Sequence, residues 1–246
     1  NFPHYFRKSN GQFYIQAWHG TPLKKIGNDV PGANLSLRYR NLMVKESENE
    51  WNLLLAQSPW AARQLSSAFG YSGPVFDGGY PRNDFLSDQT RLSEGRAKVL
   101  QDYGIDGMKT IVLYAPTWRD YLKDSSGRYS RVDFLGLAKT IQTIGKDFVV
   151  LYRGHANSSD SVQAKLPDGV VDVSKHSDVN ELMAAADMMI TDYSSIMFDF
   201  VVTEKPIAFL TPDLERYRDE TRGFYFDFEK ERPGPIFRNA HEAISW

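Results

Sequence analysis

Short apolar runs alternate with amphipathic stretches along the whole chain. Eight runs rich in Ile, Val, Leu and aromatic residues predict strands, and most of them show no alternation of apolar and polar positions. Continuous apolar runs are typical of parallel strands that are buried on both faces. The predicted strands are Phe13–Ala17, Asn52–Gln57, Pro74–Asp77, Thr110–Tyr114, Phe148–Tyr152, Val170–Val173, Met188–Thr191 and Ile207–Leu210.

Helix-like stretches lie between these strands. Ser58 followed by Pro59 marks one helix start, because serine caps a helix and proline suits its first turn. Ser177-Asp178 marks a second start, with Glu181 in its first turn. This alternation predicts a doubly wound α/β fold. The predicted helices are Pro59–Phe69, Ser93–Tyr103, Val132–Ile144, Val179–Ala186 and Ser195–Thr203, together with a solvated helix within Leu35–Asn52.

A break in the pattern near residue 82 predicts a domain boundary. Gly78, Gly79 and Pro81 interrupt the periodicity, and a helical stretch follows them. We expect residues 1–82 to be the C-terminal part of a first domain that is truncated at its N-terminus. We expect residues 83–246 to be a second domain that includes a C-terminal return. On this interpretation the chain is a piece of a longer protein.

Composition narrows the functional classes. The 246 residues carry a formal net charge of −2, so no overall basic field favours nucleic acid as a partner. There is no cysteine, which excludes disulfides, thiolate metal sites and a cysteine nucleophile. No apolar run approaches the roughly 20 residues that span a bilayer. The sequence also lacks the GxxxxGK[ST], GxGxxG, HExxH and GxSxG motifs.

A histidine follows the first predicted strand, in the stretch Trp18-His19-Gly20-Thr21. Ligands of open α/β sheets bind beyond the carboxyl ends of strands. Gly20 would let a ligand approach the backbone, and Lys24 and Lys25 could bind phosphate. A histidine with a pKa near about 6.5 can accept a proton from an attacking hydroxyl. A turn with an incidental histidine explains the same residues equally well.

Polar residues follow two further strands of the predicted sheet. Thr117 and Arg119 come after Thr110–Tyr114, and Arg153-Gly154-His155 comes after Phe148–Tyr152. An arginine and a histidine at a strand end can stabilise negative charge on a leaving phosphate. The alternative is a surface loop with an ordinary ion pair.

Asp192-Tyr193-Ser194-Ser195 lies between a buried strand and an apolar helix. Hydroxyls and unpaired backbone N–H groups at a helix start can bind phosphate, although an ordinary capping serine explains the pattern too. Asp192 and Asp199 are weak candidates for magnesium, and we expect neither a metal nor a cofactor.

Five stretches in this order resemble a known family. They are WHGTPLKKIG (18–27), GYPRND (79–84), LYAPTWRD (113–120), TDYSSIMFDF (191–200) and RGFYFDFEKERPGP (222–235). Together they resemble the CDP-glycerol glycerophosphotransferases, the teichoic acid polymerases and primases of bacterial cell walls. The resemblance covers essentially the whole chain. It implies a GT-B architecture of two Rossmann-like domains facing a cleft. On this resemblance, residues 1–82 belong to the acceptor-side domain and residues 83–246 form the domain that binds the donor nucleotide.

The resemblance also implies an activity and its residues. Glycerol phosphate passes from CDP-glycerol to the terminal hydroxyl of a lipid-linked polyol-phosphate acceptor, and CMP leaves. The histidine of the WHGT motif, here His19, is the expected base, and the histidine of the RxH motif is His155. We expect Ser194 and Ser195 to hold the donor phosphates. We expect Asp199 to hold the ribose hydroxyls of the donor, with Glu181 as the competing choice. The resemblance implies peripheral association with the cytoplasmic face of the cell membrane, through a region outside this chain, and leaves an oligomer possible.

Three alternatives remain open. The first is transfer of ribitol phosphate or another polyol phosphate. The second is a GT-B glycosyltransferase or epimerase that uses a nucleotide sugar. The third is a non-catalytic module that keeps only the nucleotide pocket.

Overall fold

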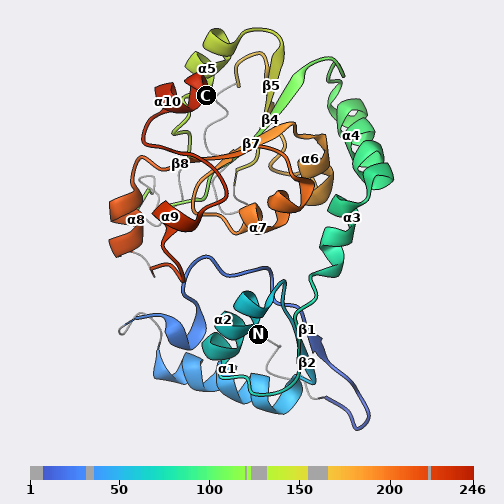
Figure 1. Cartoon of the computed structure of the whole chain (residues 1–246), viewed down its shortest axis with the longest axis vertical. Helices are drawn as coiled ribbons and strands as arrows, with labels where there is room; N and C mark the ends of the chain where they lie inside the picture. The colour runs from blue at the N-terminus through green and yellow to red at the C-terminus, as the bar shows by residue number, and fades with distance from the viewer. Residues whose placement is uncertain (1–7, 32–35, 120, 123–131, 155–165, 221–222) are drawn as a thin grey trace. The chain divides into compact units, whose positions relative to one another are not determined.

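The computed structural model describes residues 8–31, 36–119, 121–122, 132–154, 166–220 and 223–246, without the side chains of Asp219 and Glu220. The chain forms two compact units. The first unit comprises Asn1–Pro81 and Glu215–Phe228, and the second comprises Arg82–Leu214 and Glu229–Trp246. Figure 1 shows their elements along the chain.

A six-stranded parallel sheet forms the centre of the second unit. Its spatial order is β6-β5-β4-β7-β8-β9, so the first strand of this unit, β4, lies next to the fourth, β7. This is the doubly wound order 3-2-1-4-5-6, whose direction of winding reverses between β4 and β7. The strands are β4 (Thr110–Ala115), β5 (Phe148–Tyr152), β6 (Val170–Asp172), β7 (Met188–Thr191), β8 (Ile207–Leu210) and β9 (Ile236–Phe237).

Helices cover both faces of this sheet (Figure 1). Val112, Tyr114 and Val150 pack with Leu137 of α5 and Ala243 of α10 on one face. Because side chains alternate along a strand, Ile111 of β4 faces the other side of the sheet. On that side, α6 contacts β4 and packs on α4. The helices are α3 (Asp84–Ser87), α4 (Gln89–Tyr103), α5 (Leu137–Ile144), α6 (Val179–Ala185), α7 (Ile196–Phe200) and α10 (Ala240–Ser245), with 3₁₀ turns η3 (Pro81–Asn83) and η4 (Val201–Thr203).

The first unit holds a three-stranded parallel sheet in the order β1-β2-β3. Leu54 of the central strand is buried in a cluster with Leu65 of α2, Met43 of α1 and Trp51. Ser58 caps α2 by accepting the Ala61 N–H. The elements are β1 (Ile15–Gln16), 3₁₀ turn η1 (Gly27–Asp29), α1 (Leu37–Glu50), β2 (Leu53–Leu55), α2 (Pro59–Phe69) and β3 (Val75–Phe76).

A segment late in the chain returns to the first unit. Lys24 and Phe224 form an antiparallel bridge, and the hydroxyl of Tyr225 donates to Asp29 at 2.7 Å. We had expected this segment in the second domain, as part of its C-terminal return. Helices α8 (Leu214–Glu220) and α9 (Phe228–Glu231) lie at its two ends.

All eight predicted strands are present, with ends that differ by up to two residues. Two helix starts differ more. Helix α4 begins at Gln89, because Asp88 accepts the N–H groups of Thr90 and Arg91 and caps it. Helix α5 begins at Leu137, because Gly136 has φ of 63° and interrupts the predicted helix. None of the helices in the described part of the chain is long and apolar enough to cross a membrane.

Candidate functional site

The turn after β1 presents His19 between two residues with positive φ. Trp18 has φ of 47°, which is uncommon outside glycine, and Gly20 has φ of 141°. The backbone N–H of Trp18 donates to Oε1 of Gln16 at 2.8 Å. The indole ring of Trp18 lies 4.4 Å from the imidazole ring and edge-on to Phe69 at 4.6 Å. The exposed His19 therefore packs against the indole of Trp18, which in turn packs against Phe69 in the core of the first unit.

Gly20 and Thr21 are buried behind this histidine. The Thr21 hydroxyl donates to Oε1 of Gln57, two residues beyond the end of β2, at 2.6 Å. Thr21 is 3 % exposed, and this hydrogen bond fastens the turn to the segment after β2. Its expected contact with substrate stays a prediction. Gln57 is a site residue that the sequence analysis did not single out.

Lys24 and Lys25 are both half-buried. The ammonium of Lys24 donates to the Tyr217 hydroxyl at 2.9 Å and lies 5.5 Å from the centre of that ring. The backbone N–H of Lys25 donates to the carbonyl of Gly223 at 3.0 Å. These contacts bind the lysines to the returning segment, and their expected role in phosphate binding stays a prediction.

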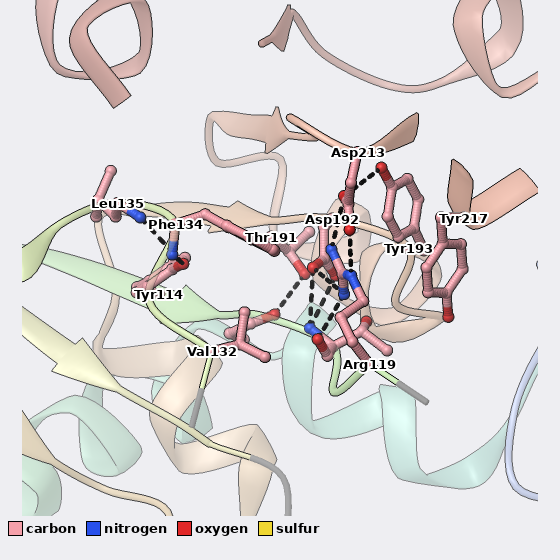
Figure 2. Close-up of polar contacts among 12 residues, drawn as sticks. Tyr114, Arg119, Val132, Phe134, Leu135, Thr191, Asp192, Tyr193, Asp213 and Tyr217 are labelled. Atoms are coloured by element: carbon pink, nitrogen blue, oxygen red, sulfur yellow. Dashed lines mark hydrogen bonds and ion pairs between the residues drawn. The ribbon is translucent and has the colours of Figure 1, made fainter. Parts of the chain in front are cut away.

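In the second unit, Arg119 and Asp192 form a buried ion pair with an Nη1–Oδ2 distance of 2.9 Å. Their side chains are 0 % and 2 % exposed, so both charges are removed from solvent. The carboxylate of Asp192 also accepts the Thr117 N–H at 2.9 and 3.1 Å. Figure 2 shows these contacts at the carboxyl ends of β4 and β7, where the winding of the sheet reverses. Arg119 and Asp192 thus hold one another and the turn after β4, and their expected contacts with substrate stay a prediction.

Asp213, which follows β8, completes this network (Figure 2). Its carboxylate accepts Nε of Arg119 at 2.7 Å and Nη2 at 3.1 Å. The hydroxyl of Tyr193 donates to it at 3.0 Å, and the hydroxyl of Tyr121 is a further donor. Burial alone would raise the pKa of Asp213, but the hydrogen bonds from Arg119 and Tyr121 outweigh burial and hold the pKa below its ordinary value.

Ser194 and Ser195 follow Tyr193 and precede α7, which has five residues. The Ser194 hydroxyl accepts the N–H of Ile196 at 3.4 Å, a long hydrogen bond. Among the contacts that the structure describes, the Ser195 side chain caps no amide of α7. The expected phosphate cradle therefore depends on the two hydroxyls and the turn more than on a long helix.

Arg153 lies at the end of β5, as expected. Its Nη1 donates to the carbonyls of Val173 and His176 at 3.2 and 3.0 Å. Burial lowers its pKa. Arg153 thus holds the loop after β6, and its role toward the donor stays a prediction. His155 lies outside the described residues.

Both ribose candidates are ion-paired. Nη2 of Arg82 donates hydrogen bonds to both carboxylate oxygens of Asp199, each at 3.1 Å. Oε2 of Glu181 lies 2.9 Å from Nζ of Lys98 and 2.9 Å from Nε2 of His176, and both contacts are hydrogen bonds. Burial opposes ionisation of Glu181, but these hydrogen bonds outweigh it and hold its pKa below the ordinary value. The choice between the two stays open. Within the described ranges, no three His, Cys, Asp or Glu residues gather as a metal site would require.

Comparison with known proteins relates this geometry to a family. Residues 1–245 match the CDP-glycerol:poly(glycerophosphate) glycerophosphotransferases. The chain belongs to this family. It is 37% identical over 248 residues to the teichoic acid poly(glycerol phosphate) polymerase of Bacillus spizizenii, covering 98% of this chain and 62% of that protein. It is also 37% identical over 247 residues to the teichoic acid glycerol-phosphate transferase of Staphylococcus aureus, covering 98% and 63%.

Solved structures of this glycerophosphotransferase family share the fold. A variant of the wall teichoic acid polymerase TagF that was soaked with CDPG matches with a TM-score of 0.89 and 30% identity, covering 99% of this chain and 60% of that one. This likeness confirms the predicted GT-B-like α/β class. The chain spans about three fifths of that structure and of the two family relatives above.

Proposed function

We propose that this chain is the donor-binding and catalytic part of a CDP-glycerol glycerophosphotransferase. Its substrates are CDP-glycerol and a lipid-linked acceptor of the teichoic acid type. The observation that carries the proposal is His19, presented by the strained turn after β1 within a chain whose family and 37%-identical relatives use glycerol phosphate.

In the proposed reaction, the terminal hydroxyl oxygen of the acceptor attacks the β-phosphorus of CDP-glycerol. A new P–O bond forms, the P–O bond to the bridging oxygen breaks, and CMP leaves with that electron pair. His19 accepts the proton of the attacking hydroxyl. Ser194 and Ser195 hold the donor phosphates, and His155 steadies the leaving phosphate.

The site geometry supports a reaction driven by positioning. Phosphoryl transfer needs an aligned nucleophile and fixed groups around the phosphates. The ring of Trp18 restricts the imidazole of His19, and Asp192 and Tyr193 restrict the turn that carries the serines. His19 and the two serines therefore lie on backbone segments whose geometry is fixed before substrate binds.

Product analysis tests the function directly. The intact protein is incubated with a lipid-linked acceptor and either CDP-glycerol, CDP-ribitol or a UDP-sugar, and CMP release and acceptor elongation are measured. We expect both products only with CDP-glycerol. Activity with CDP-ribitol or the UDP-sugar alone would assign one of the other transferases. Binding of CDP-glycerol without any product would identify a non-catalytic module.

We infer further that the protein associates peripherally with the cytoplasmic face of the bacterial cell membrane, because its proposed acceptor is anchored there. Fractionation of cells tests this location. The protein should sediment with membranes and be released by high salt or alkaline carbonate. Recovery entirely in the soluble fraction would contradict the inference.

A further inference from the structure

Two consecutive residues anchor the turn that precedes Ser194 and Ser195. The carboxylate of Asp192 accepts the Thr117 N–H and pairs with Arg119. The hydroxyl of Tyr193, whose side chain is fully buried, donates to Asp213 at 3.0 Å. Among the described contacts, the serine hydroxyls take part only in the long bond from Ile196, and the backbone carbonyls of Ser194 and Ser195 accept the N–H groups of Met197 and Phe198 at 3.4 and 3.1 Å. Their position is therefore set by what holds Asp192 and Tyr193.

Asp213 is the group that ties both anchors together. It receives two nitrogen atoms of Arg119, and Arg119 in turn pairs with Asp192. The guanidinium carbon of Arg119 lies 4.8 Å from the centre of the Tyr193 ring. One carboxylate thus fixes the cation that holds Asp192 and the hydroxyl that holds Tyr193. Figure 2 shows Asp213, Tyr193 and Arg119 converging.

Hydrogen bonds stabilise the excess negative charge of this network. Two carboxylates face one guanidinium, so one negative charge is in excess. The hydroxyls of Tyr121 and Tyr193 and the N–H of Thr117 donate to those carboxylates. Nη1 of Arg119 also donates to the carbonyl of Thr117 at 2.5 Å, so each of its nitrogen atoms is bound. A buried network whose charged groups are all hydrogen-bonded is rigid and tolerates little displacement.

We propose that Asp213 is a positioning residue that fixes the turn 192–195 through Arg119 and Tyr193. It does not touch the substrate. The inference rests on the proposed function only in placing the donor phosphates at Ser194 and Ser195. The consequence for the reaction is that loss of the Tyr193–Asp213 bond loosens the serines without changing their chemistry.

Three variants test the proposal in the intact protein. Tyr193→Phe removes one hydroxyl bond to Asp213, and Asp213→Asn removes its charge. Tyr121→Phe removes the other tyrosine bond to the same carboxylate but lies outside the turn. Hydrogen exchange of the backbone amides of residues 192–197 is measured, together with the Kd for CDP-glycerol.

We expect Tyr193→Phe and Asp213→Asn to speed exchange at these amides about tenfold and to weaken donor binding about threefold to tenfold. Tyr121→Phe should change both quantities less than Tyr193→Phe. Unchanged exchange in Tyr193→Phe, or an equal rise in all amides of the second unit, would overturn the proposal. If Asp213→Asn does not fold, Tyr193→Phe alone decides.

The double variant Ser194→Ala with Ser195→Ala distinguishes failure of the proposed phosphate site from failure of the proposed role of Asp213. If it leaves donor affinity unchanged while Tyr193→Phe loosens the turn, the serines are not the phosphate site and the anchoring by Asp213 stands. If it weakens donor binding while Tyr193→Phe changes neither exchange nor affinity, the phosphate site stands and the role of Asp213 is overturned.

Discussion

The rings of Trp18 and His19 lie 4.4 Å apart and are tilted by 31°. Both residues lie in the turn beyond β1, where Trp18 has a positive φ of 47°. The indole is itself anchored on Phe69. The conformation that strains the backbone is therefore the one that brings the imidazole against a fixed aromatic surface.

The first prediction concerns His19 as the base. His19→Ala should lower kcat by at least about 10²-fold, because a general base contributes that much or more. The Kd for CDP-glycerol should stay nearly constant, since the proton leaves the acceptor. Single-turnover rates and donor titration measure the two quantities. His241→Ala, at an exposed histidine of α10, is the matched control. A near-normal kcat in His19→Ala would exclude the base assignment.

The second prediction concerns Trp18. Trp18→Leu should lower kcat about twofold to tenfold, because aromatic ring contacts contribute about 0.5–1.5 kcal/mol. Trp51→Leu is the control, because Trp51 also packs edge-on against Phe69, at 5.2 Å, in the same cluster. Both variants should lower the Tm. If kcat falls equally in both after correction for folded protein, the contact with His19 has no role in turnover.

The third prediction concerns Arg119. Arg119→Met should lower the free energy of unfolding by about 3–5 kcal/mol, because it leaves Asp192 and Asp213 without their cation in a buried place. Arg91 pairs with Asp88 at 3.9 Å on the surface, and Arg91→Met should cost less than about 0.5 kcal/mol. Urea unfolding gives both values. A loss below about 1 kcal/mol for Arg119→Met would show that solvent or rearrangement neutralises the carboxylates.

The fourth prediction concerns Gly27, at the end of the WHGTPLKKIG stretch. Its φ is 54°, and a Cβ there would lie 2.1 Å from the carbonyl oxygen of Ala68. Gly104 has a similar φ of 62° with nothing within 4 Å of a Cβ. Gly104→Ala should cost about 1–2 kcal/mol for the left-handed backbone alone. Gly27→Ala should cost about 1–3 kcal/mol more, for the clash. Equal melting temperatures would contradict the close approach.

Local sequence was enough for the elements with strong internal signals. Helix α2 has the bounds predicted from Ser58, Pro59 and its apolar positions, because the cap and the period lie within the helix itself. Strand β9, Ile236–Phe237, was not predicted, because two residues carry no period. It forms only because the edge of β8 is available for pairing.

For the polar residues at the strand ends, the sequence located the positions but did not show which of them contact one another. The rule that ligands bind beyond strand ends located Arg119, Arg153 and Asp192, and applied to Thr211-Pro212-Asp213 after β8 it would have found Asp213. It could not tell which of these residues bind one another. That depends on the strand order, which places the ends of β4, β7 and β8 side by side.

The sequence by itself determined the alternation of strands and helices, the family and the candidate residues, because apolar period, helix caps and linked motifs are properties of neighbouring positions. Only the tertiary structure decided that Arg119 is held by Asp213, 94 positions away, and that Lys24 meets Tyr217. A charged side chain in a loop can face water, a ligand or another side chain with the same local sequence. Burial and the distance to an opposite charge decide among these, and both exist only once the chain is folded.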